Sequence, residues 1–195
     1  MRKVPLLAIA ALISSSSAWA DSCALKPPDS KLLDYQQGKG LRVIAGRYQF
    51  DLTERPDALL AFDGVMATYP KKEYISYQLI PSSSINETLS QFTTRRLSTA
   101  QLDRYLYGLD DIADLNQSDQ DLIGNMRSDL KIDCQTQLTK YGIGPEVKAL
   151  FQERSASDAE YRILIFSDKS THLISVKGTR ERAIEILQSI KKRSL

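Results

Sequence analysis

The sequence predicts an α+β fold, with an antiparallel β-meander, a helical insertion, a C-terminal β-hairpin and a closing C-terminal helix. Alternating apolar and polar residues predict strands between 41 and 80 and again between 161 and 177. The stretch from about 84 to 153 carries helix-start signals and an apolar spacing of three to four residues. Strands and helices that occur in separate runs along the chain are typical of α+β proteins.

The first twenty residues have the layout of a secretory signal peptide. Arg2 and Lys3 give a positive start, residues 4–13 form a mostly apolar run, and a small-x-small motif ends at Ala20. Cleavage is therefore expected between Ala20 and Asp21. The apolar run is too short for a membrane-spanning helix, which needs about 20 apolar residues. The sequence predicts a periplasmic or secreted protein without an integral membrane segment.

Removal of the signal peptide changes the charge of the chain. The full sequence has 26 basic and 24 acidic residues, and the signal takes away two of the basic ones. The remaining chain is close to neutral, which removes the main argument for nucleic-acid binding. Residues 21–195 have a length that suits a single domain with its own core.

The two cysteines of the chain, Cys23 and Cys134, are expected to form a disulfide. A disulfide is the usual state of a cysteine pair in an oxidising compartment. This one would close a loop of roughly 110 residues and stabilise the fold by about 4–5 kcal/mol in the chain-entropy treatment. The alternative is a pair of unrelated thiols.

The first part of the chain is predicted to be mainly strands. A short helix containing Leu32 and Leu33 is expected to precede them. Residues 48–52 alternate in polarity and predict a strand with one wet face. Two apolar runs on either side of Asp63-Gly64 predict a hairpin whose turn residues have positive φ. Residues 74–80 predict a further strand.

The middle of the chain is predicted to hold three helices. Ser98 and Gln101 have the spacing of a capping box, which favours a helix start at this point. A second helix is expected to run from Ser118 to about 141, with Cys134 on its apolar side. Pro145 is expected to open a third, short helix that ends before residue 154.

The end of the chain returns to strands and closes with a helix. Residues 161–166 and 171–177 are rich in β-branched and aromatic side chains and are separated by a short polar loop, which predicts a hairpin. A helix is expected to follow Gly178-Thr179. Its apolar stripe consists of Ala183, Ile184, Leu187 and Ile190.

The sequence offers little that points to catalysis. The only histidine, His172, shares one face of its predicted strand with Ile174 and Val176. This position favours a half-buried core histidine over a catalytic base. Neither a nucleophile motif nor a phosphate-binding loop is present, and one histidine with two paired cysteines leaves almost no zinc ligands. We therefore expect no catalytic residues, no metal and no cofactor, although carboxylates that converge in space would leave no sequence signal.

An acidic stretch is the candidate partner-binding surface. From 97 to 133 there are eight aspartates against three basic residues, and Asp110, Asp111 and Asp114 are clustered within it. The spacing fails the calcium-loop pattern of the EF-hand. An acidic helical face can attract a basic partner. The alternative is a solvated surface whose acids favour helix starts.

Two function hypotheses follow from these observations. The first is an exported, non-catalytic protein that binds another protein, such as an immunity or inhibitor protein that neutralises a secreted toxin or hydrolase. The second is a periplasmic protein that binds a small ligand or maintains the envelope through a pocket between sheet and helices. The first is favoured by export, small size, the expected disulfide, the acidic face and the lack of catalytic motifs.

Overall fold

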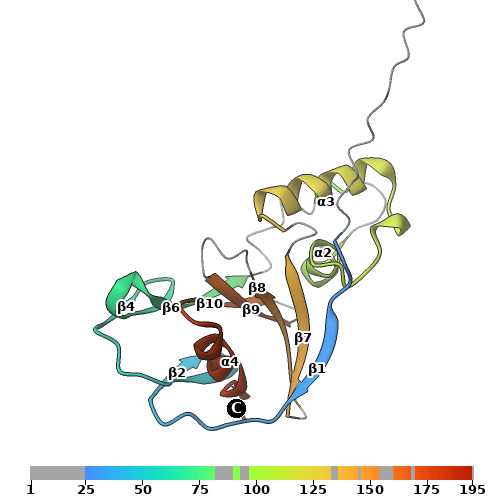
Figure 1. Cartoon of the computed structure of the whole chain (residues 1–195). Coiled ribbons are helices and arrows are strands. Elements are labelled where there is room, and N and C mark those ends of the chain that lie inside the picture. Colours follow the sequence, from blue (N-terminus) through green and yellow to red (C-terminus); the bar gives the residue numbers. More distant parts are fainter. Residues whose placement is uncertain are drawn as a thin grey trace, which may run out of the picture.

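The structure is a computed structural model of the 195-residue chain (Figure 1). It describes residues 25–81, 90–92, 97–132, 136–144, 146–153, 160–167 and 170–194. These residues form eleven strands in two sheets and three α-helices, which confirms the α+β class. Among them, no helix combines the length and the apolar character that a membrane crossing requires.

The larger sheet has eight strands, and all neighbouring pairs are antiparallel except β1 and β7, which are parallel. In order across the sheet, the strands are β1 (Asp29–Leu33), β7 (Gln137–Ile143), β8 (Val147–Glu153), β9 (Glu160–Ser167), β10 (Ser170–Lys177), β6 (Tyr74–Pro81), β5 (Gly64–Thr68) and β4 (Ala58–Ala61). β1 and β4 are therefore its two edges.

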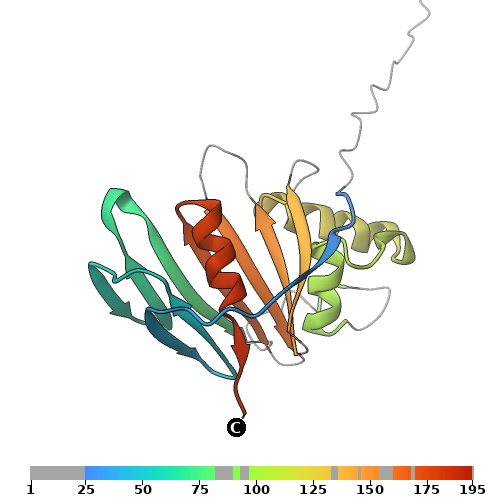
Figure 2. The same cartoon turned by 60° about the horizontal axis from the view of Figure 1, so that its bottom comes forward.

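One face of this sheet is covered by the C-terminal helix and the smaller sheet (Figure 2). The helix is α4 (Arg180–Gln188), and the smaller sheet pairs β2 (Leu41–Ala45), β3 (Tyr48–Leu52) and the two-residue β11 (Lys191–Lys192). A 3-10 helix, η1 (Pro70–Lys72), connects β5 and β6. We call this side of the large sheet the α4 face.

The opposite face is covered by the helical insertion, and we call it the α2–α3 face. Its elements are α2 (Thr99–Leu106), the 3-10 helix η3 (Ile112–Asp114) and α3 (Gln117–Asp129). The capping box expected at the start of α2 is confirmed, because Ser98 Oγ accepts from the backbone N–H of Gln101 and the Gln101 side chain accepts from the N–H of Ser98.

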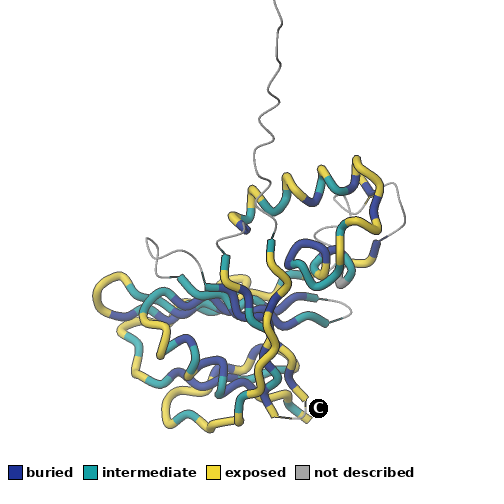
Figure 3. Tube along the Cα trace, turned by 45° about the vertical axis from the view of Figure 1, so that its right-hand side comes forward, coloured by how far each residue is buried: buried dark blue, intermediate teal, exposed yellow. Residues whose placement is uncertain are grey.

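Successive side chains of the central strands divide between two apolar clusters. In β9, Ile163 and Ile165 join the cluster under α4, whereas Leu164 between them joins the cluster under α2 and α3. Figure 3 shows the buried residues concentrated in the strands and in the helix faces turned toward them. The period-2 alternation of a strand therefore gives each layer of the domain its own core.

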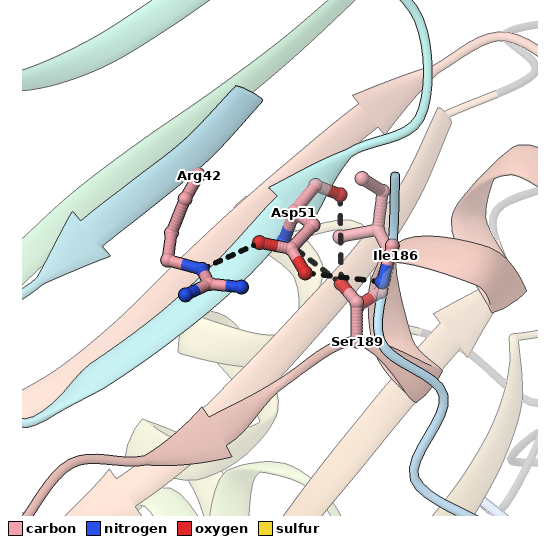
Figure 4. A network of polar contacts seen from close by, with 5 residues as sticks. Arg42, Asp51, Ile186 and Ser189 are labelled. Carbon is pink, nitrogen blue, oxygen red and sulfur yellow. Dashed lines mark hydrogen bonds and ion pairs between the residues drawn. The ribbon is translucent and has the colours of Figure 1, made fainter. Parts of the chain in front are cut away.

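A buried polar network joins β3 to the end of α4 (Figure 4). Asp51 is only 2% exposed; its carboxylate accepts from Arg42 Nε and from the backbone N–H of Gly38, each at 3.0 Å. The backbone N–H of Asp51 donates to Ser189 Oγ at 3.0 Å, and this hydroxyl donates to the carbonyl of Ile186. The expectation of a wet face on this strand is wrong at Asp51, because α4 and the 38–40 segment cover it.

The predicted C-terminal hairpin and closing helix are confirmed as β9, β10 and α4. Thr179 caps α4 by accepting from the N–H of Arg182. The hairpin expected around Asp63-Gly64 is confirmed as β4 and β5, but its turn is different from the one predicted. Neither turn residue has positive φ. Glycine is needed here because a Cβ on Gly64 would lie 2.0 Å from the carbonyl oxygen of Tyr77.

The long second helix is the largest error of the sequence analysis. α3 ends at Asp129, and residues 137–143 and 147–153 form β7 and β8 instead of helices. Both faces of these strands are covered, so apolar residues point to either side and the period-2 signal is lost. Leu138 and Tyr141, three residues apart, fit a helical stripe in sequence but lie in different clusters in the structure.

The end of α3 gave no sequence signal because its capping residue is a lysine. Lys131 has a φ of 55°. Its N–H donates to the carbonyl of Ser128, and the N–H of Ile132 donates to the carbonyl of Arg127. These are the bonds of a Schellman motif, in which glycine is the usual residue.

The short helix expected around Leu32 and Leu33 is also wrong, because these residues lie in β1. Their strand pairs in parallel with β7, more than a hundred positions along the chain, with Leu33 opposite Ile143. A parallel partner at this distance leaves no turn signal in the sequence.

Candidate functional site

The acidic cluster proposed as a partner surface is used largely by the fold itself. The carboxylate of Asp110 forms a two-pronged ion pair with Arg104, at 2.7 and 2.5 Å. Asp111 caps η3 by accepting from the N–H of Ala113, and the exposed Asp114 lies in the first turn of the same element. These contacts favour the alternative interpretation, in which the acids serve local helix starts.

The expected disulfide and the signal cleavage site lie outside the described residues. Cys23, Cys134, Ala20 and Asp21 all belong to segments that the structure leaves undescribed. The disulfide between the cysteines and the cleavage between Ala20 and Asp21 therefore stay predictions.

His172 lies on the α4 face of β10 and is 5% exposed, with Ile174 and Val176 buried on the same side of the strand. Its Nδ1 atom is 3.0 Å from the hydroxyl of Tyr77, and the ring of Tyr48 packs edge-on against the imidazole with centroids 4.8 Å apart. Burial lowers the pKa of His172, so the imidazole is neutral at pH 7.

A pocket of about 480 Å³ opens beside this histidine. It is formed by the β2–β3 turn, the end of β9, the start of β10, and residues of β6 and β11. Its lining consists of Gly46, Arg47, Tyr48, Leu79, Ser167, Ser170, His172 and Lys192. Gly46 in the β2–β3 turn has a φ of 60°, a conformation that glycine adopts without strain, and a Cβ at this position would lie 3.7 Å from Cε1 of His172.

Both charged side chains among these lining residues are cationic. Arg47 and Lys192 are exposed, and neither lies within ion-pair distance of a carboxylate in the part of the chain that the structure describes. Among the described residues, the pocket therefore combines two positive charges without an ion-pair partner and the edge of a neutral imidazole. The same described segments contain no group of three or more His, Cys, Asp and Glu side chains placed to hold a metal ion.

A second surface feature is the edge of the large sheet at β4. All four residues of β4 are apolar and exposed. Leu59 and Leu60 in the strand are 53% and 52% exposed. Phe62, which follows the strand directly, is 56% exposed. We call β4 together with Phe62 the β4 edge.

The other edge of the sheet differs in its chemistry. β1 carries Asp29 and Lys31, and it pairs with β7 through all five of its residues. Charged side chains on an edge strand, lysine above all, discourage pairing with a further strand. β4 has no such charge, and no strand among the described residues pairs with its outer side, where its leucines are exposed.

The sequence indicated only parts of the His172 pocket and of the β4 edge. The hairpin at Asp63-Gly64 was predicted, but nothing in its apolar runs indicated that β4 would be an edge with both faces uncovered. His172 was singled out as the only histidine. Arg47 and Lys192 were missed because they come from segments that only the fold brings together.

No family model matches this chain, and neither a curated protein nor a solved structure matches it significantly.

Proposed function

We propose that this chain is an exported, non-catalytic protein that binds another protein by adding an extended segment of its partner alongside β4. The observation that carries the proposal is the β4 edge, a terminal strand made of four exposed apolar residues. Strand addition of this kind draws affinity from main-chain hydrogen bonds and specificity from alternate side chains.

The composition of β4 makes an unoccupied edge costly. Free edges in natural proteins are commonly short, charged, bulged or covered, because an apolar edge invites aggregation. β4 is short, but it offers Leu59 on one side of the strand and Leu60 on the other. A partner strand would cover both leucines and pair the outward N–H and C=O groups in one step.

The sequence supports the class of partner. A signal peptide sends the chain to an oxidising compartment, and the sequence lacks motifs for nucleotide, metal or nucleic-acid chemistry. A small exported domain with a ready binding edge suits an immunity or inhibitor protein that blocks a secreted toxin or hydrolase.

The experiment compares two single substitutions on opposite edges of the same sheet. Leu60→Lys places a charge on the β4 edge, and Leu32→Lys makes the same change on β1, where Leu32 is 88% exposed. Each purified variant and the wild type serve as bait on an envelope extract, with bound proteins quantified by mass spectrometry. Thermal melts check that both variants fold as the wild type does.

We expect one stoichiometric partner on the wild type and on Leu32→Lys, with at least about a tenfold loss on Leu60→Lys. A partner retained equally by all three baits would overturn the proposal. Light scattering that shows a dimer, broken only by Leu60→Lys, would overturn it as well, because the edge would then be an interface between two copies of this chain.

A further inference from the structure

The His172 pocket, defined by the lining residues given above, is independent of the β4 edge. We propose that it binds a small organic anion. The oxyanion head group would meet His172 and the two cations, and the apolar part of the ligand would lie against Leu79 and Tyr48. This is a second binding site, and it does not depend on the protein-binding function.

The ring nitrogen of His172 that is not bonded to Tyr77 supports this assignment. Nε2 has no hydrogen-bond partner among the described residues. It is also not among their buried atoms that lack a partner, so we infer that it is accessible from the pocket that His172 lines. Burial raises the pKa of Tyr77, so its phenol keeps its proton and can donate to Nδ1. The imidazole then carries its own proton on Nε2 and presents an N–H donor to the pocket.

Arg47 and Lys192 are the charged side chains among the described lining residues of the pocket. Arg47 lies in the β2–β3 turn, and its backbone carbonyl accepts from the N–H of Arg193 at 2.8 Å, which holds the turn against the C-terminal segment. Lys192 stands opposite Tyr48 in the pairing of β11 with β3. Both side chains therefore come from backbone that is fixed by hydrogen bonds. Unpaired cations around an N–H donor favour a carboxylate or a phosphate ester.

The remaining walls set the size and polarity of the ligand. Leu79 lies directly across from His172 in the pairing of β6 and β10 and is 42% exposed. Ser167 and Ser170 also line the pocket and bond to each other across the end of the hairpin, with their hydroxyl oxygens 3.0 Å apart. A volume of about 480 Å³ lies within the roughly 300–1,000 Å³ of small-molecule sites.

His172 provides a direct probe of this site, because it is the only histidine of the chain. Octanoate, a carboxylate with an apolar tail, is titrated into the wild-type protein while the ring 15N and 13C resonances of His172 are followed by NMR. Octylamine, which has the same tail and the opposite charge, is titrated in parallel. We expect octanoate to shift the Nε2 resonance saturably, with a Kd below about 1 mM, and octylamine to leave it unchanged.

A matched pair of variants tests the role of charge. Arg47→Gln with Lys192→Gln removes both pocket cations, and Arg55→Gln with Lys26→Gln makes the same change at exposed positions outside the pocket lining. We expect octanoate affinity to fall at least about tenfold in the first double variant and to stay unchanged in the second. The absence of a saturable shift up to about 10 mM octanoate, or equal binding of octylamine, would overturn the proposal. Unchanged octanoate affinity in the pocket variant would overturn it too.

Discussion

The two faces of the large sheet differ in the size of their apolar cores and in the polar groups that they bury. On the α4 face, the buried carboxylate of Asp51 has two described donors, and the backbone N–H of Asp51 donates to Ser189 at the end of α4. On the α2–α3 face, Gln152 is fully buried, and both polar atoms of its side chain lack a hydrogen-bond partner. The α4 face is not free of this desolvation cost, because the buried hydroxyl of Tyr69, in the cluster under α4, also lacks a partner, but the α2–α3 face carries two such atoms on one side chain.

The sizes of the two apolar clusters indicate which face contributes more to the stability of the domain. The cluster under α4 takes residues from six strands of the large sheet as well as from β2, β3 and α4. Nine of its members are at most 1% exposed, and those with 0% exposure include Phe151, Ile163 and Ile186. The cluster under α2 and α3 draws its strand residues from β7, β8 and β9. The α4 face is the larger and more continuous core, so we expect it to dominate stability.

The largest expected effect comes from truncating adjacent residues of β9. Ile163 and Leu164 are 0% and 3% exposed and point to opposite faces. We expect Ile163→Ala to lower the free energy of unfolding by about 4 kcal/mol and Leu164→Ala by about 2–3 kcal/mol, because the smaller cluster relaxes more easily around a cavity. Urea denaturation measures both. A greater loss from Leu164→Ala would reverse the ranking of the two faces.

A smaller loss is expected from the polar network of the α4 face. Asp51→Ala leaves the N–H of Gly38 without its partner and removes the ion pair with Arg42, whose side chain is 44% exposed. We expect the free energy of unfolding to fall by about 2 kcal/mol, mainly from the lost hydrogen bonds to a buried charge, since the solvated arginine contributes little. Arg42→Gln is the control, with an expected loss below about 1 kcal/mol. Equal losses would place the stabilisation in the ion pair instead.

Replacing Gln152, whose buried amide lacks hydrogen-bond partners, is expected to increase stability. Gln152→Met keeps the length of the side chain and removes two polar atoms that have no partner. We expect the free energy of unfolding to rise by about 1–2 kcal/mol, measured by urea denaturation. Gln137→Met, at an exposed position of β7, should change it by less than about 0.5 kcal/mol. A destabilised Gln152→Met protein would mean that the amide is satisfied by an internal water.

The sequence predicted the elements whose signals are local and missed those that depend on distant neighbours. The N-caps at Ser98 and Thr179 are local signals, so the starts of α2 and α4 were predicted correctly. β7 and β8 were predicted as helix because both of their faces are covered and their apolar residues do not alternate. The end of α3 was missed because Lys131 holds a conformation in which glycine is usual.

The candidate site was even less predictable than the fold. His172 is easily noticed as the only histidine, but its partner Tyr77 lies 95 positions away in the sequence. Lys192 lies near Tyr48 only because β11 pairs with β3. No spacing rule connects such residues. The β4 edge was hidden for a related reason, since the apolar pattern of a strand does not reveal whether a neighbour will cover it.

The smallest expected effect is a pH dependence of opposite sign on the two faces. Burial lowers the pKa of His172 from its ordinary 6.5, so this group costs stability as the pH falls through 6.5, where the unfolded chain takes up the proton first. On the α2–α3 face, burial raises the pKa of Asp103 from its ordinary 3.8, although a hydrogen bond from Thr171 opposes the shift. The native state then binds the proton first, so this group favours folding increasingly as the pH falls toward 3.8.

Two variants separate these contributions. In His172→Gln, the free energy of unfolding should fall less than in the wild type between pH 7 and 5.5, because the histidine no longer has to stay neutral in the folded state. In Asp103→Asn, it should fall more steeply than in the wild type as the pH drops from about 6 to 4, because the favourable protonation of Asp103 is gone. Urea denaturation at each pH measures both slopes. Identical pH profiles for the wild type and a variant would show that the group titrates alike in the folded and unfolded chain, and the contrast between the faces would then be one of packing alone.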